Sequence, residues 1–459
     1  MRLLHYSDIE NVYDRPERAG RLAGLLEAYR DDETIVVGTG DDLGPSVLSM
    51  ETDGRQSLDF FRAVAPDVET FGNHDFDYGL DATRKIVRES PQVWTSANVR
   101  ESAETARETA DEVRVGERFA DAAPTTVVER GGESVGFAGV TDPESSVPDS
   151  LTVTDPVEAV REATDDLRDR GVDRVVALAH VPDRRLRDVA AVPGVDAVLA
   201  GHVHGERRDR IEGTLVVRPG ANGRVVWEVE LGETVEAARL ETADAPVDET
   251  VAERLRDRMA ATGLAEVVGR ATVPIERERR EWFAGERRVT NFVADAYRWA
   301  TGADASFFDA AMLREGPPLS GEVTVADLRG LAPFAADLRV ASVSGETLGT
   351  LVEEAVLTDE RADRVAGEEL WWGHFAGMAV VWDRDAEAVR EIRVDGEPLD
   401  PEAEYSLATT GYVLWSDEFP AVSLADAEEA WGVQYDALVE YARAVGVRAE
   451  LDGRIEVAE

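Results

Sequence analysis

Four of the six histidines in this 459-residue chain lie in short segments where apolar runs end, and other such runs end in carboxylates. Imidazole nitrogens, carboxylates and amide oxygens are the ligands that divalent metal ions take from proteins. A chance His-x-His is expected only roughly 0.08 times at this histidine content, yet one is present. The groups follow apolar runs at 3–4, 35–37, 68–71, 175–179 and 197–199, and they are Asp8 with Glu10, Asp41 with Asp42, Asn73 with His74 and Asp75, His180, and His202 with His204.

The recurrence of such groups is more informative than any single acidic residue. With 94 Asp and Glu in the chain, a lone carboxylate fits a solvated surface as well as it fits a site. Histidine is rare here, so the four histidines after apolar runs are interpreted as functional. His5 and His374 are not among these four histidines, and we predict that both are core residues.

A sheet must position these side chains, because each group follows an apolar run. Apolar runs that alternate with amphipathic stretches are typical of an α/β domain. In open α/β sheets, ligands gather beyond the carboxyl ends of the strands. The pattern therefore predicts that the five groups converge at that edge.

Local signals predict further elements of this half. Asp155-Pro156 has the form of an N-cap and first helical residue, and it predicts a helix that ends near Arg170. Gly131-Gly132 between two apolar runs predicts a hairpin. Three short apolar runs within 210–231 predict a meander, and the charged, alanine-rich residues 233–265 predict a helical linker.

The charge of the chain is strongly acidic. Lys and Arg number 49 against 94 Asp and Glu, a formal net charge of −45, and Lys85 is the single lysine. This balance resembles that of proteins from salt-loving organisms, because high salt screens the repulsion among surface carboxylates. We expect low salt to destabilise the protein. We also expect no nucleic-acid polymer as partner, since no broad basic footprint is present.

Several further classes are disfavoured by composition. The absence of cysteine excludes disulfides, thiolate metal sites and a cysteine nucleophile. The first residues are not typical of a signal peptide, and no apolar stretch approaches the about 18 residues of a membrane span. We expect a cytoplasmic location and no membrane partner.

The motifs, taken in order, resemble those of the calcineurin-like metallophosphoesterases, and specifically those of the bifunctional 5′-nucleotidases and UDP-sugar hydrolases. That family has Asp-x-His, Gly-Asp, Gly-Asn-His-Asp/Glu, a later His and Gly-His-x-His, and the chain matches at Asp8, 40–41, 72–75, His180 and 201–204. The second half resembles the family's C-terminal domain. The resemblance implies an α/β fold: an N-terminal α/β/β/α sandwich (1–232), the linker (233–265) and a C-terminal α+β substrate-binding domain (266–459).

The resemblance also implies two divalent metal ions. One ion would take Asp8, Glu10 and His204, the other would take Asn73, His180 and His202, and Asp41 would bridge them. Glu10 stands where the family has histidine. A carboxylate there favours Mn²⁺ or Mg²⁺ over Zn²⁺, because those ions prefer oxygen ligands. The alternative is that Glu10 points away and Asn11 or water fills the position.

The family's other site residues have counterparts here. His74 would stabilise phosphoryl charge or protonate the leaving oxygen, and Asp77 would orient its ring, although Asp77 also fits a helix-start carboxylate. In the second half, Arg314 would bind a phosphate, and Phe334 and Tyr412 would stack on a base. The alternatives are core packing for the two rings and a surface ion pair for Arg314.

Together these observations predict metal-dependent hydrolysis of small phosphate esters, above all 5′-nucleotides, by a water that two metal ions activate. Three alternatives stay open: hydrolysis of non-nucleotide esters, phosphodiester or nuclease activity at the same metal site, and a non-catalytic nucleotide-binding protein. The last two arise because related nucleases share the strand-end motifs, and because two glycine-rich stretches of the family are replaced here at 309–314 and 416–419.

Overall fold

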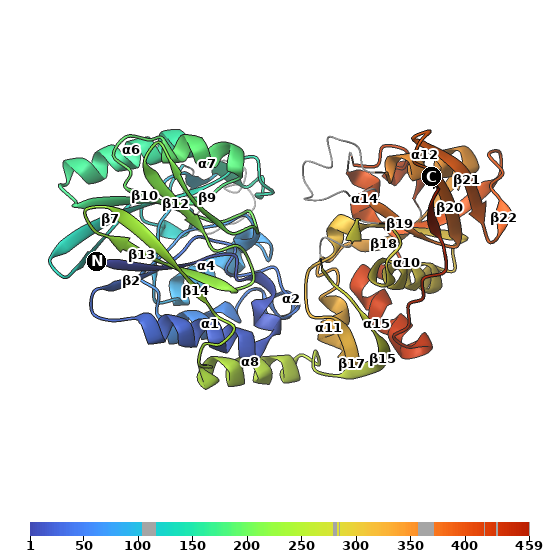
Figure 1. Ribbon diagram of the computed structural model, residues 1–459, viewed down its shortest axis with the longest axis horizontal. Coiled ribbons are helices and arrows are strands. Elements are labelled where there is room, and N and C mark those ends of the chain that lie inside the picture. Colours follow the sequence, from blue (N-terminus) through green and yellow to red (C-terminus); the bar gives the residue numbers. More distant parts are fainter. Residues whose placement is uncertain are drawn as a thin grey trace. The chain divides into compact units, whose positions relative to one another are not determined.

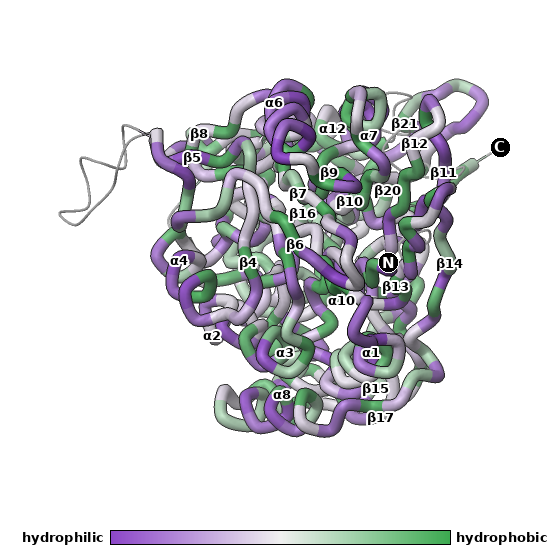
Figure 2. The backbone as a smooth tube through the Cα atoms, turned by 90° about the vertical axis from the view of Figure 1, so that its left-hand side faces the viewer, coloured by the Kyte–Doolittle hydropathy of each residue, from purple (hydrophilic) through white to green (hydrophobic). Residues whose placement is uncertain are grey.

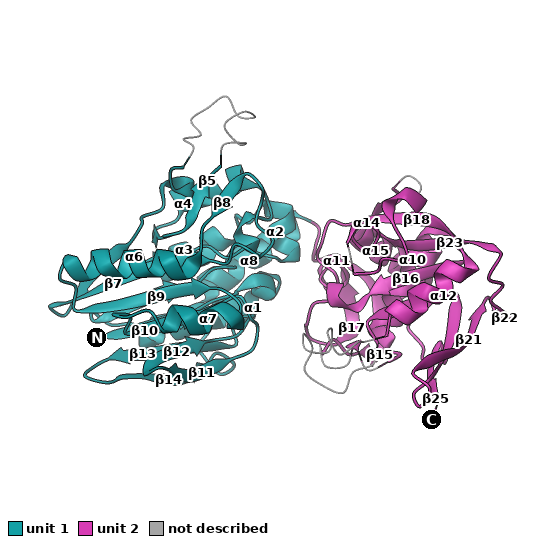
Figure 3. Ribbon diagram, turned by 90° about the horizontal axis from the view of Figure 1, so that it is seen from above, with its two compact units in different colours: residues 1–262 teal, residues 263–459 magenta. Residues whose placement is uncertain are grey.

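The computed structural model describes residues 1–102, 116–278, 282–283, 285–356, 371–416, 418–427 and 430–458. The chain divides into two compact units, residues 1–262 and 263–459 (Figure 3). Among the described residues, no helix has both the length and the apolar character that crossing a membrane requires.

Two six-stranded sheets form the centre of the first unit. The first sheet has the order β14 (Val235–Glu241), β13 (Val225–Leu231), β1 (Arg2–Tyr6), β2 (Thr34–Gly38), β3 (Val68–Glu69), β4 (Val93–Trp94). The second has the order β11 (Arg207–Ile211), β12 (Thr214–Arg218), β10 (Ala197–Ala200), β9 (Arg174–His180), β7 (Glu133–Thr141), β6 (Thr126–Arg130). The central strands of each sheet are parallel: β1 to β4 in the first, and β7, β9, β10 and β12 in the second.

Helices cover the outer faces of both sheets (Figure 1). One group is α1 (Pro16–Tyr29), α3 (Ser57–Val64) and α8 (Glu249–Ala261), and the other is α6 (Pro156–Asp169) and α7 (Asp183–Ala190). The smaller elements are η1 (Glu10–Asp14), α2 (Val47–Thr52), η2 (His74–Phe76), α4 (Leu80–Glu89), β5 (Val99–Glu101), η3 (Phe119–Asp121) and β8 (Leu151–Val153). The layers are helix, sheet, sheet, helix, so the predicted α/β/β/α sandwich is confirmed.

The core of this unit lies between the two sheets. Leu3, Ile35 and Val37 of the first sheet belong to one buried cluster with Val176 and Leu199 of the second. Strand β9 is coloured hydrophobic in Figure 2, whereas much of α6 is hydrophilic. Each such side chain contributes about 1.5–3 kcal/mol when fully buried, so the strand ends project from a firmly packed platform.

Two local predictions are confirmed. The Asp155 side chain accepts the N–H groups of Val157 and Glu158 and caps α6, and β6 pairs with β7 as an antiparallel hairpin.

The predicted meander is wrong in its pairing. Strands β11 and β12 pair in the second sheet, whereas β13 pairs with β1 and β14 in the first. Turn signals predict where strands end, but not which sheet the next strand joins. The loop at 219–224 therefore crosses from one sheet to the other.

The segment 233–265 also differs from the predicted helical linker. It contains strand β14, which pairs with β13 along its whole length, and helix α8, which packs on α1 and α3. Both elements belong to the first compact unit. β14 is an edge strand with a largely solvated face, so it carries charged residues. Because of these charges, the sequence pattern did not indicate a strand.

The second unit combines three sheets with helices. The strand orders are β19 (Gly373–Ala376), β16 (Ala305–Asp309), β23 (Glu404–Thr410), β18 (Asp337–Ser344), β24 (Gly432–Val433); then β22 (Glu397–Pro398), β21 (Ala388–Val394), β20 (Met378–Asp383), β25 (Ile455–Ala458); and β15 (Val267–Ile275) with β17 (Leu319–Thr324). The helices are α10 (Arg288–Thr301), η4 (Ala310–Met312), α11 (Val325–Arg329), α12 (Gly345–Glu354), α14 (Gly411–Trp415), η5 (Leu424–Asp426) and α15 (Gln434–Val445).

Candidate functional site

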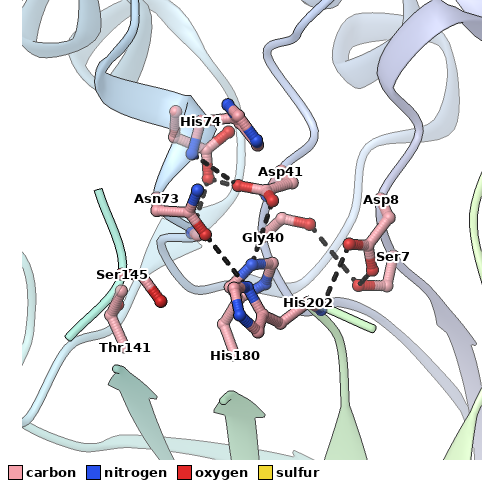
Figure 4. Close-up of polar contacts among 12 residues, drawn as sticks. Ser7, Asp8, Gly40, Asp41, Asn73, His74, Thr141, Ser145, His180 and His202 are labelled. Carbon is pink, nitrogen blue, oxygen red and sulfur yellow. Dashed lines mark hydrogen bonds and ion pairs between the residues drawn. The ribbon is translucent and has the colours of Figure 1, made fainter. Parts of the chain in front are cut away.

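The candidate residues of the first unit come from the carboxyl ends of parallel strands. The strands and the groups that follow them are β1 with Asp8 and Glu10, β2 with Asp41, β3 with Asn73 and His74, β9 with His180, and β10 with His202 and His204. Figure 4 shows that side chains from both sheets meet in one place. The convergence expected from the sequence is therefore present in the fold.

A first group of candidate ligands contains Asp41, His180 and His202, whose ligand atoms all lie within 4.8 Å of one another. His180 Nε2 lies 3.0 Å from Asp41 Oδ2, but it makes no well-aligned hydrogen bond although the residue is fully buried. His202 Nδ1 lies 3.0 Å from Asn73 Oδ1. Asn73 thus borders this group through its amide oxygen.

A second group contains Asp8, Glu10 and His204, again with ligand atoms within 4.8 Å of one another. Glu10 Oε1 lies 2.8 Å from His204 Nε2, and Glu10 is buried whereas His204 is exposed. The Glu10 side chain therefore points into the site, toward His204, and does not point away as in the alternative interpretation.

The two groups are direct neighbours. The backbone N–H of His202, a member of the first group, donates to Asp8 Oδ1 in the second group over 3.1 Å. Asp41 also adjoins both, because the N–H of Glu10 donates to the carbonyl of Asp41. Two cation positions side by side are compatible with this arrangement.

Neighbouring groups fix the orientation of the candidate ligands. His180 Nδ1 lies 2.8 Å from the carbonyl oxygen of Thr39, which leaves Nε2 facing Asp41. The hydroxyl of Ser7 donates to Asp8 Oδ2. Partners of this kind set the tautomer and direction of metal ligands.

The electrostatics of the site favour bound cations. Burial raises the pKa of Asp8 to about 7, and the charges of Asp41 and Glu10 add to this effect. Burial opposes charge on His180 as well, but Asp41 and Asp8 outweigh it and raise its pKa to about 10. Burial lowers the pKa of His202 to about 3, so this imidazole is neutral and able to ligate. Three buried carboxylates beside the neutral imidazole of His202 fit divalent cations, which would offset the carboxylate charge.

Four candidate ligands have a left-handed backbone conformation, which non-glycine residues seldom adopt. The φ angles are +50° for Asp8, +47° for Glu10, +56° for Asp41 and +74° for His202. Such conformations cost on the order of 1–3 kcal/mol each and persist only where the surroundings impose them. The fold therefore holds these backbones in place against their own preference.

Two glycines let the loops after β2 and β3 touch. A Cβ on Gly40 would lie 2.2 Å from the backbone nitrogen of Gly72, and a Cβ on Gly72 would lie 2.1 Å from Asp41 Oδ1. Neither position tolerates a side chain. The contact brings Asp41 against the loop that carries Asn73 and His74.

His74 lies beside the metal groups but belongs to neither. Its backbone N–H donates to Asp41 Oδ1 over 2.7 Å, and its Nδ1 lies 2.8 Å from Asp77 Oδ2. Burial opposes its charge, but Asp41 and Asp77 outweigh it and raise the pKa of His74 to about 9. A protonated, partly exposed imidazole is suited to proton donation.

The second unit brings its predicted residues to one end of its five-stranded sheet. Arg314 follows β16, and Tyr412 follows β23, which runs parallel to β16. Phe334 precedes β18, and because β18 is antiparallel to β23, the start of β18 lies at the same end of the sheet. The Arg314 guanidinium lies 4.4 Å above the Phe334 ring and donates to the carbonyls of Ala311 and Leu313. The Tyr412 ring meets that of Trp415 edge-on at 5.2 Å. We call Arg314, Phe334, Tyr412 and Trp415 the aromatic edge.

The sequence interpretation missed three contributors to these sites. The Thr39 carbonyl has no side-chain signature, so sequence could not single it out. Trp415 is 64% exposed, and in the sequence it ends the apolar run 412–415, where nothing distinguishes it from a core residue. Asp75 was visible within the motif at 72–75, but its role was not assigned. His5 and His374 are fully buried, as predicted for core residues.

Comparison with protein families matches both halves of the chain. Residues 1–206 match "Calcineurin-like phosphoesterase", and residues 267–423 match "5′-nucleotidase, C-terminal domain". The structure is similar to that of a 5′-nucleotidase precursor from Thermus thermophilus, with a TM-score of 0.78, 23% identity, and coverage of 100% of this chain and 99% of the other. This likeness concerns the fold.

Curated relatives have related names. "Endonuclease YhcR" of Bacillus subtilis is 24% identical over 98% of this chain and 39% of its own length. "Trifunctional nucleotide phosphoesterase protein YfkN" of the same organism is 22% identical over 99% of this chain and 34% of its own length. The chain thus spans only a third to two fifths of these relatives. Others are named 5′-nucleotidases or 2′,3′-cyclic-nucleotide 2′-phosphodiesterase/3′-nucleotidases, and the calcineurin-like phosphoesterase fold is that of hydrolases.

Proposed function

We propose, from the premise that this chain combines a calcineurin-like phosphoesterase domain with a 5′-nucleotidase C-terminal domain, that it hydrolyses phosphate esters of nucleotides with two divalent metal ions. The observation that carries the proposal is the pair of adjoining ligand groups, Asp8–Glu10–His204 and Asp41–His180–His202.

The ligands of each ion follow from these groups. One ion would be held by Asp8, Glu10 and His204, the other would be held by Asn73, His180 and His202, and Asp41 would be shared. Two ions bound there would polarise the phosphoryl group and lower the pKa of a coordinated water. We propose Mn²⁺ or Mg²⁺ over Zn²⁺, because Glu10 adds an oxygen donor and a negative charge to the first position.

His74 provides the proton of the reaction. Its Nδ1 is held by Asp77, so Nε2 is free to face the leaving oxygen and to donate to it as the phosphorus–oxygen bond breaks. Asp77 acts through His74, since its carboxylate fixes the ring and keeps it protonated. General-acid catalysis of this kind contributes typically about 10²–10⁴-fold.

Nucleotides are the substrate class that the second unit favours. Phe334 and Tyr412 offer rings for stacking on a base, and Arg314 offers a cation for a phosphate. The stacking of Arg314 on Phe334 adds a constraint, because one face of that ring is already covered. The base would then stack on the other face.

Cyclic phosphodiesterase activity is the second candidate. Relatives named 2′,3′-cyclic-nucleotide 2′-phosphodiesterase/3′-nucleotidase match 40% and 43% of the chain. The same metal groups would serve both reactions, because each requires an attacking water and a clamped phosphoryl group.

Phosphate release from a panel of esters tests the proposal. Metal-stripped protein in molar KCl receives Mn²⁺, Mg²⁺ or Zn²⁺, and the esters are AMP, UDP-glucose, 2′,3′-cyclic AMP and p-nitrophenyl phosphate. We expect metal-dependent turnover, fastest with Mn²⁺ or Mg²⁺ on a nucleotide. Because ring opening of the cyclic ester frees no phosphate, its products are separated by chromatography. Metal binding without turnover of any ester would contradict the proposal and favour the non-catalytic alternative.

A further inference from the structure

The carboxylate of Asp75 accepts four backbone N–H groups, from Asp41, Asp42, Leu43 and Gly72. Oδ2 accepts from Gly72 over 2.7 Å and from Asp41 over 3.0 Å; Oδ1 accepts from Asp42 and from Leu43, each over 3.0 Å. Asp75 is 1% exposed. One buried carboxylate thus satisfies three consecutive amides of the loop after β2 and one amide of the loop after β3.

The contact between the two loops is reciprocal. Asp75, on the β3 loop, holds the backbone of Asp41, while the side chain of Asp41, on the β2 loop, accepts the N–H of His74 over 2.7 Å. The carbonyl of Asp75 accepts the Thr83 hydroxyl over 2.7 Å, which ties Asp75 to α4. These bonds hold Asp41 at φ +56°, a conformation that it would not adopt by itself.

We propose that Asp75 is a positioning residue for the metal centre, which fixes the backbone of Asp41 so that its carboxylate faces both cation positions. The inference rests on the proposed function, since it concerns the residue assigned there to both ions. Asp75 acts through backbone amides, and it touches neither substrate nor metal.

Asp75→Asn tests the proposal, because asparagine has nearly the same size and shape as aspartate. The amide nitrogen of asparagine cannot accept hydrogen bonds, so two of the four N–H groups lose their acceptor. Loss of a partner that orients a metal ligand typically costs about 10–100-fold in metal affinity. We expect Asp75→Asn to bind Mn²⁺ at least about tenfold more weakly than the wild type in calorimetric titration.

Asp196→Asn is the matched control. Asp196 Oδ2 accepts one backbone N–H, that of Val175, over 2.7 Å and pairs with Arg168, but it precedes β10 at the amino ends of the strands. This variant should lower the melting temperature without changing Mn²⁺ affinity. Equal loss of affinity in both variants would show a general structural effect and overturn the proposal.

Hydrogen–deuterium exchange of the metal-free protein provides a readout that does not depend on metal. Exchange should accelerate in the peptides that contain residues 41–43 and 72 of Asp75→Asn, and it should not change there in Asp196→Asn. Unchanged exchange in Asp75→Asn would overturn the positioning role even if the metal proposal holds. A wild type that binds no Mn²⁺ would instead overturn the proposed function, while exchange would still decide the role of Asp75.

Thr83→Val keeps the proposal falsifiable if Asp75→Asn does not fold. This change removes the hydroxyl that holds the Asp75 carbonyl over 2.7 Å and that lies 3.3 Å from the Gly79 carbonyl, and valine has nearly the same shape as threonine. We expect weaker Mn²⁺ binding, by less than in Asp75→Asn. Wild-type affinity and wild-type exchange in a folded Thr83→Val would count against the proposal.

Discussion

The metal centre of the first unit and the aromatic edge of the second unit differ in how they hold their side chains. In the metal centre, short side chains project from strand ends, and backbone bonds fix them: His202 N–H donates to Asp8, and His74 N–H donates to Asp41. At the aromatic edge, long side chains pack on one another, as Arg314 does on Phe334. The first arrangement fixes ligand geometry mainly through backbone hydrogen bonds, whereas the second relies on contacts between the side chains themselves.

This difference has a consequence for substrate range. Under the proposed function, the preorganised metal centre would act on the phosphoryl group that all esters share. Stacking rings would favour substrates that carry a planar ring, such as a nucleotide base. Substitutions in the two regions should therefore separate chemistry from recognition.

Asp41→Asn should have the largest effect. It removes the carboxylate that we propose both ions share, and a loss of several kcal/mol in transition-state stabilisation corresponds to about a thousandfold or more in rate. Initial rates with AMP and p-nitrophenyl phosphate should fall together. Asp67→Asn is the control, because Asp67 accepts the Val36 N–H over 2.9 Å but precedes β3 at its amino end. A strong loss on AMP alone would contradict the comparison.

His74→Ala should have the next largest effect. We expect kcat to fall by about 10²–10⁴-fold with Mn²⁺ affinity unchanged, because His74 is proposed as a general acid and not as a ligand. Steady-state kinetics and calorimetric titration of the same preparation measure both. A matching loss of Mn²⁺ would place His74 among the ligands.

Phe334→Ala should have a smaller and selective effect. Stacking on one base is worth about 1–3 kcal/mol, so KM for AMP should rise about tenfold or somewhat more. KM for glycerol 3-phosphate should change little, because this ester carries no ring that could stack on Phe334. Trp415→Ala serves as a comparison, since Trp415 is the more exposed ring of the Tyr412–Trp415 pair. Equal changes on both substrates would remove the distinction between the two regions.

Lowering KCl from molar to about 0.1 M should have the smallest effect on the difference between the two regions, because salt screens surface charges on both units. Weaker screening of a net charge of −45 should lower the melting temperature by several degrees, at about 2–4 °C per kcal/mol. The Mn²⁺ affinity of the molecules that stay folded should change little, because salt screens the buried charges of the candidate site less than it screens surface charges. Differential scanning calorimetry at both salt concentrations checks this, and a rise in melting temperature at low salt would refute the interpretation of the acidic surface.

Much of the first unit could be predicted because its signals are local. An apolar run followed by Asp, Asn or His predicts both a strand and the group at its end, and Asp155-Pro156 predicts the start of α6. The pairing of β13 with β1 could not be predicted, because their contact joins residues more than 200 positions apart. The edge strand β14 was hidden for a second reason, since its charged residues resemble a solvated helix.

The sequence by itself determined which residue types the chain places at strand ends, in which order, and hence the chemistry available to it. Only the tertiary structure decided that Glu10 faces His204, that Arg314 covers a face of Phe334, and that Asp75 serves four amides of two loops. The physical reason is one of range. Strand-forming and capping tendencies arise among neighbours in the chain, whereas side-chain direction and left-handed backbone at Asp8, Asp41 and His202 depend on contacts between distant segments.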